Sequence, residues 1–97
     1  MADLILKPAT GDGNKLIIQN KAGTAVLTTS DNVDILPPAD NTVDLGSTSY
    51  RWKNIYTTDL HLQNDRGNWT VIDEEDYLTL RNNKTNKVYK LVMEEIE

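Results

Sequence analysis

The sequence predicts a mainly β protein made of short antiparallel strands and hairpins, with one short helical turn near residues 49–54. Three observations lead to this fold class. Apolar and polar residues alternate over short stretches, which is the period of a half-buried strand. Turn-forming runs rich in Gly, Asn and Asp separate these stretches at roughly ten-residue spacing. The chain has 97 residues, no Cys and no Phe, so any hydrophobic core must be small.

Residues 1–36 are expected to form an N-terminal β lobe that attaches to another protein or caps an assembly. The run Leu16-Ile17-Ile18 predicts a strand buried on both faces. A hairpin turn ending at Gly23 is expected to use the positive φ that glycine tolerates. Pro37-Pro38 ends the lobe, because proline cannot donate to a strand ladder. The extended segments predicted here are residues 4–6, 15–19, 24–29 and 33–35.

Residues 37–64 are expected to form a strand at residues 43–45, a helical turn, and a second strand around Leu60 and Leu62. Ser47 or Ser49 can cap the turn, and Trp52, Ile55 and Tyr56 follow at spacings of three and four that place them on one helical face. So short a chain has too few residues to cover this aromatic surface, which predicts that other copies cover it. The predicted interface residues are Leu45, Trp52, Ile55, Tyr56, Leu60 and Leu62.

Residues 65–97 are expected to form a C-terminal β-meander. Three strands are predicted at residues 69–72, 77–80 and 87–93, because each stretch is rich in β-branched, aromatic or alternating residues. In an alternative interpretation, the acidic run that leads into Tyr77 forms a helical turn over residues 73–77. In the strand at residues 87–93, Tyr89 and Leu91 are expected on one face and Val88 and Lys90 on the other.

Residues 44–56, Asp-Leu-Gly-Ser-Thr-Ser-Tyr-Arg-Trp-Lys-Asn-Ile-Tyr, resemble the D-L-G-S-x-x-x-R-W-x-N-I-Y segment of bacteriophage tail-fibre and other virion fibre proteins. The flanking sequences are similar to short structural proteins of marine and cyanobacterial phages. The resemblance implies an intertwined homotrimer, assembled in the host cytoplasm and carried in the virion, with other tail or capsid proteins as partners. Only about forty residues follow the segment, so the self-cleaving chaperone found in many such proteins is not expected.

Two other functions remain open at this stage. One is a receptor- or glycan-binding tip of a tail fibre, with Trp69 and Tyr77 as the contacts to a host surface. The other is a monomeric β-barrel adaptor. The mass of the chain in solution distinguishes a trimer from the monomeric adaptor, and Trp69→Ala tests adsorption to the host.

Composition and motifs argue against catalysis, metal binding and nucleic-acid binding. His61 is the only histidine and lacks partners at the spacing of a catalytic triad or zinc site. The carboxylates at residues 31, 34 and 73–76 lack the loop spacing of a calcium site. A net charge of −5 disfavours binding to phosphate backbones. No cofactor is expected, and no apolar run approaches the length of a membrane span.

Overall fold

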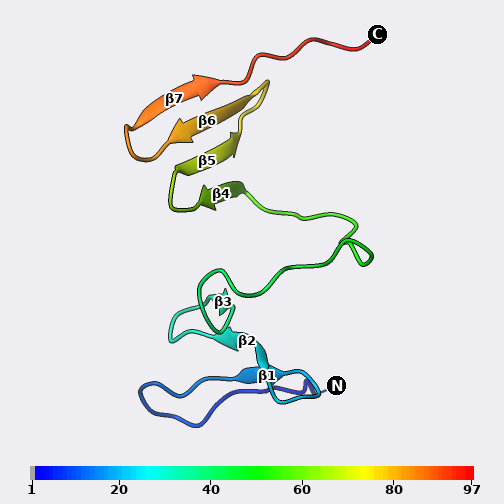
Figure 1. The fold of residues 1–97 in the computed structure, drawn as a ribbon, viewed down its shortest axis with the longest axis vertical. Coiled ribbons are helices and arrows are strands. Elements are labelled where there is room, and N and C mark those ends of the chain that lie inside the picture. The colour runs from blue at the N-terminus through cyan, green and yellow to red at the C-terminus, as the bar shows by residue number, and fades with distance from the viewer. Residues whose placement is uncertain (1) are drawn as a thin grey trace. The chain divides into compact units, whose positions relative to one another are not determined.

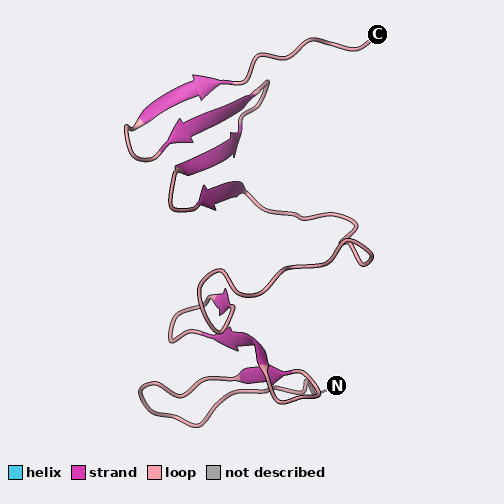
Figure 2. Cartoon of the chain, in the orientation of Figure 1, coloured by secondary structure: helices cyan, strands magenta, loops and turns pink. Residues whose placement is uncertain are grey.

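The computed structural model describes residues 2–97, which form two compact units, residues 2–51 and residues 52–97. Every regular element is a strand, and Figure 2 shows strands joined by loops without a helix in the described part of the chain. Both sheets are antiparallel, one of three strands and one of four. The prediction of a mainly β fold of short antiparallel strands is therefore confirmed.

The first unit contains a three-stranded sheet in the order β1-β2-β3 (Figure 1). Its strands are β1 (Ile17–Gln19), β2 (Ala25–Thr29) and β3 (Ile35–Leu36). The turn between β1 and β2 is closed by the amide of Gly23, which donates to the carbonyl of Asn20 at 3.0 Å. Gly23 has the predicted positive φ, at 86°. The side-chain oxygen of Asn20 accepts hydrogen bonds from the backbone amides of Ala22 and Thr24.

The second unit contains a four-stranded meander in the order β4-β5-β6-β7. Its strands are β4 (Asp59–Gln63), β5 (Asn68–Asp73), β6 (Leu78–Asn82) and β7 (Lys87–Lys90). The three strands predicted after residue 65 are confirmed, and β4 adds the strand predicted around Leu60 and Leu62 to the same sheet. β7 is shorter than predicted because its neighbour β6 begins at Leu78, so only one further bond follows, from the Leu91 amide to the Leu78 carbonyl.

The predicted helical turn near residues 49–54 is wrong. The amide of Ser47 donates to the carbonyl of Tyr50, and the Ser47 hydroxyl accepts the Tyr50 amide, so this serine closes a tight turn and caps no helix. A six-residue helix must offset the cost of nucleation with very few hydrogen bonds. The alternative helical turn over residues 73–77 is also wrong, because the Glu74 amide bonds to the Tyr77 carbonyl in a turn that joins β5 to β6.

Two predicted strands are absent because no neighbouring strand pairs with them. Residues 4–6 and 43–45 have no regular secondary structure. A strand needs a partner for its backbone N–H and C=O groups, and apolar alternation alone does not provide one. The predicted burial of both faces at residues 16–18 is also wrong for the single chain, since Ile17 and Ile18 remain 51% and 48% exposed.

The described residues contain no buried hydrophobic side chain. The buried residues are the threonines Thr28, Thr70 and Thr79, which lie on strands β2, β5 and β6. The larger apolar side chains on the strands and in the loops all remain at least partly accessible to solvent. Within residues 2–97 there is also no helix that could cross a membrane. The fold thus consists of hydrogen-bonded sheets whose apolar surfaces are only partly covered in the single chain.

Candidate functional site

The four-stranded sheet has one face that is mainly apolar, with Asp73, Asn82 and Lys87 as its polar members. Residues paired across antiparallel strands lie on the same face, so the register that aligns Leu60, Val71, Leu80 and Tyr89 defines a continuous apolar row. The next rows on this face begin with Leu62 paired to Trp69 and with Asp73 paired to Leu78. We call this the apolar face and define it by its large apolar side chains: Leu60, Leu62, Trp69, Val71, Leu78, Leu80 and Tyr89.

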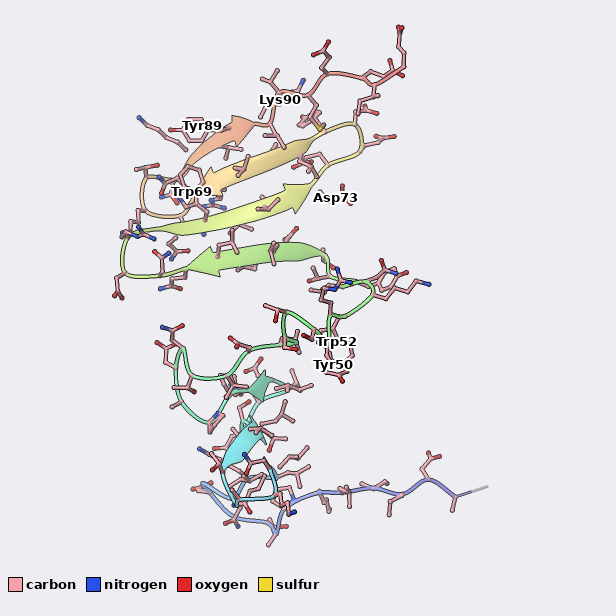
Figure 3. The ribbon with its side chains drawn as sticks, turned by 45° about the vertical axis from the view of Figure 1, so that its right-hand side comes forward. Tyr50, Trp52, Trp69, Asp73, Tyr89 and Lys90 are labelled. Atoms are coloured by element: carbon pink, nitrogen blue, oxygen red, sulfur yellow. The ribbon has the colours of Figure 1, made fainter. Side chains whose placement is uncertain are left out.

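The described chain covers the apolar face only in part, and none of its large apolar side chains is fully buried. Leu60, Leu62 and Tyr89 are 48%, 52% and 48% exposed, and Trp69 is half-buried. Trp69 and Tyr89 contact each other across the sheet with ring centroids 5.9 Å apart and planes tilted by 43° (Figure 3). This is a favourable aromatic arrangement, but it covers only part of each ring. An antiparallel sheet normally packs such a face against another layer.

The opposite face is mainly polar and is held together by side-chain hydrogen bonds. The Asn83 amide nitrogen donates to the Asn68 side-chain oxygen and to the Thr70 hydroxyl, both at 2.9 Å. The Thr70 hydroxyl lies 3.1 Å from Nδ1 of His61. This network joins β4, β5 and the loop after β6. We call this surface the polar face, and its aliphatic members are Ile72 and Val88.

The His61 ring therefore contacts a threonine hydroxyl. Glu74 accepts a bond from the Thr79 hydroxyl at 3.4 Å, which ties the acidic turn to β6. Among residues 2–97, no group of three or more His, Cys, Asp or Glu side chains is placed to hold a metal ion.

The two aromatic residues considered for glycan contact lie on different faces of the sheet. Trp69 belongs to the apolar face. The Tyr77 ring lies under the Lys90 ammonium, at 4.6 Å from nitrogen to ring centroid, and Lys90 is paired with Thr79 on the polar face. Trp69 and Tyr77 therefore do not form one continuous platform for a sugar ring.

The predicted interface residues are all exposed in the single chain, and they divide between the units. Leu60 and Leu62 are on the apolar face. Trp52, Ile55 and Tyr56 are 63%, 69% and 92% exposed in the irregular segment that leads into β4, where residues 55–58 line a shallow open hollow. Leu45 is 74% exposed and belongs to the first unit.

Sequence reasoning missed that Trp69, Val71, Leu80 and Tyr89 share a face with Leu60 and Leu62. Alternation within each strand was visible, but it shows only that every second residue is apolar. The cross-strand register decides which residues of neighbouring strands align, and the short turns at residues 64–67 and 83–86 fix it here.

Comparisons with protein-family models, with curated proteins and with solved structures found no match to this chain. The resemblance of residues 44–56 to virion fibre proteins stays a prediction.

Proposed function

We propose that this protein is a structural component of a bacteriophage virion that acts, without catalysis, as a homotrimer. It is a short fibre or a decoration component of the tail or capsid. In each chain, the predicted interface residues and the apolar face pack against the other two copies. The observation that carries the proposal is the lack of any buried hydrophobic side chain in residues 2–97.

The accessible surface supports burial between chains. A single chain exposes 9688 Å². A compact monomer of 10.9 kDa exposes roughly 5,600 Å² by the usual scaling of surface with mass, and two separate folded bodies of half that mass expose roughly 6,700 Å² together. The excess of about 3,000 Å² per chain is of the size that obligate assemblies bury.

The nature of the exposed side chains supports the same conclusion. Contiguous apolar patches beyond a few hundred Å² mark interaction sites on soluble proteins. Here the apolar face lies in the same unit as the irregular segment that contains Trp52, Ile55 and Tyr56. These residues also belong to the sequence segment that resembles virion fibre proteins, in which the corresponding segment is part of a trimeric shaft.

The function is tested by the protein content of purified phage particles whose genome encodes this chain. We expect mass spectrometry to find the chain in the particle in a copy number divisible by three, and an antibody against it to label the particle surface. A phage enzyme that acts only inside the infected cell serves as the negative control. Purified particles that lack the chain would refute the virion role.

A further inference from the structure

The N-terminal segment, residues 3–7, runs as an extended chain without a partner strand in the described structure (Figure 3). All of its residues are exposed, and its apolar side chains are 69% to 88% exposed. A segment of this kind can add a strand to the open edge of another sheet. We propose that residues 4–7 of one copy form an additional antiparallel strand on the β4 edge of a second copy, with Lys7 opposite Asp59. This inference rests on the proposed assembly of several copies and specifies one contact between them.

The accepting edge is β4, which has only β5 beside it. Along a pair of antiparallel strands, bonded residues alternate with residues whose backbone groups point away from the partner. The Asn64 amide bonds to the Gly67 carbonyl, so the alternation directs the backbone groups of Asp59 and His61 outward. The Asp59 carbonyl already accepts the Thr57 hydroxyl at 3.0 Å, and its second lone pair remains for an added strand. This edge therefore offers donors and acceptors to a further chain.

Leucines meet leucines on the apolar face in this register. Leu6 lies opposite Leu60, and Leu4 lies opposite Leu62. Residues opposite each other across antiparallel strands share a face, so the added strand extends two rows that already cross the sheet. Leu60 and Leu62 are 48% and 52% exposed, and each gains an apolar neighbour. The donated segment therefore widens the apolar face.

The charges and the proline of the segment fit the same register. Lys7 lies opposite Asp59 on the polar face, and opposite charges that face each other across strands are stabilising. The backbone groups of these two residues bond to each other, and the next bonded pair is Ile5 with His61. Pro8 follows, and its nitrogen faces away from β4 at this position. The N–H that proline lacks is therefore not needed for the pairing.

Other pairings on β4 lose one of these matches. A parallel strand that keeps leucine opposite leucine brings Asp3 opposite Asp59, and like charges directly opposite are destabilising. A slip of one residue turns both leucines of the segment to the polar face. A slip of two residues places Lys7 opposite His61 or Thr57 and leaves one leucine pair unmatched. The antiparallel register with Lys7 opposite Asp59 keeps all three matches.

The remaining open edges fit the segment less well. β1 and β3 have three and two residues, fewer than the donated segment. On β7, the register that pairs Asp3 with Lys90 places Leu6 opposite Lys87. Registers that place both leucines opposite apolar residues put Ile5 opposite Lys90 and form no charge pair. The β4 edge is therefore the one that matches the apolar residues and the charge together.

Disulfide trapping tests the pairing, because the chain contains no cysteine. The test variant is Ile5→Cys with His61→Cys, a bonded pair whose Cα atoms lie about 5.5 Å apart in an antiparallel ladder, within the roughly 7 Å that a disulfide spans. A second test pair in the same register, Leu6→Cys with Leu60→Cys, keeps the histidine in place. The control is Ile5→Cys with Gln63→Cys, which uses the same face but lies about 7 Å further along the strand.

After mild oxidation at micromolar concentration, we expect non-reducing electrophoresis to show loss of the single-chain band for both test pairs. Disulfide-linked species of two or more chains should replace it, with much less cross-linking in the control. Light scattering of the reduced variants shows whether they still assemble. Assembled test variants that do not cross-link, or that cross-link no more than the control, overturn the strand pairing and leave the homotrimer intact.

Two further outcomes separate the contact from the assembly. If the oxidised test variants stay single chains whose two cysteines are joined to each other, the segment does not pass between copies, and the inference is overturned. A monomeric mass for the unmodified protein overturns the proposed homotrimer and the strand pairing together.

Discussion

Replacing Trp52 with alanine is expected to destabilise the assembled protein far more than the single chain would indicate. Trp52 is 63% exposed, and a Trp side chain offers about 250 Å², so about 160 Å² of it remains open to cover. At about 25 cal/mol per Å², covering this surface contributes about 4 kcal/mol per chain. This agrees with the roughly 3–5 kcal/mol lost when a large aromatic core site is emptied.

The free energy of unfolding should be measured by chemical denaturation at several protein concentrations, because the stability of an oligomer depends on concentration. The matched control is Tyr50→Ala. Tyr50 is 84% exposed, is outside the predicted interface, and holds its turn through backbone groups and the Ser47 hydroxyl. We expect the control to cost less than about 1 kcal/mol, as surface substitutions usually do. If Trp52→Ala unfolds at the same denaturant concentration as the parent, Trp52 is not buried between copies.

Three further predictions concern substitutions in the strands and in the turns that join them. Leu62→Asp places a charge on the apolar face and is expected to reduce the mass in solution to that of a single chain. Gln63→Asp, one residue later on the polar face, should leave the mass unchanged. Equal effects of the two variants would contradict the assignment of faces. Asn83→Ala removes two side-chain bonds and is expected to lower the free energy of unfolding by about 1–3 kcal/mol, so an unchanged melting temperature would show that the network does not stabilise the sheet. Gly23→Ala forces alanine to a φ of 86° and should lower the free energy of unfolding by about 1 kcal/mol. Gly67 has no positive φ, and a methyl group there would meet only ordinary contacts at 3.4 Å, so Gly67→Ala should be neutral or slightly stabilising. Thermal melts of both variants test this order, and a reversed order would contradict it.

The strands after residue 59 could be predicted because each has alternation, β-branched or aromatic residues and a turn at both ends. Trp69, Val71 and Leu80 have neighbours close in sequence, so short turns bring their strands together. The combined apolar face could not be predicted in the same way, since it depends on register across four strands.

The segment from Val43 to Tyr56 shows where local patterns fail. The spacing of Trp52, Ile55 and Tyr56 imitates a helical face, but the segment is too short to offset helix nucleation, and Ser47 closes a turn. Residues 4–6 show the complementary failure, because their apolar character is suited to a strand but the described chain offers no partner. In both places the sequence carries apolar residues that the single chain leaves exposed.

The mass of the protein in solution tests most directly whether its apolar surfaces are covered by other copies. Size-exclusion chromatography with light scattering, at micromolar concentration and moderate salt, should give about three times the 10.9 kDa mass of one chain. A mass close to 11 kDa that persists as concentration rises would contradict the proposed trimer, because the exposed surface would then belong to a stable monomer.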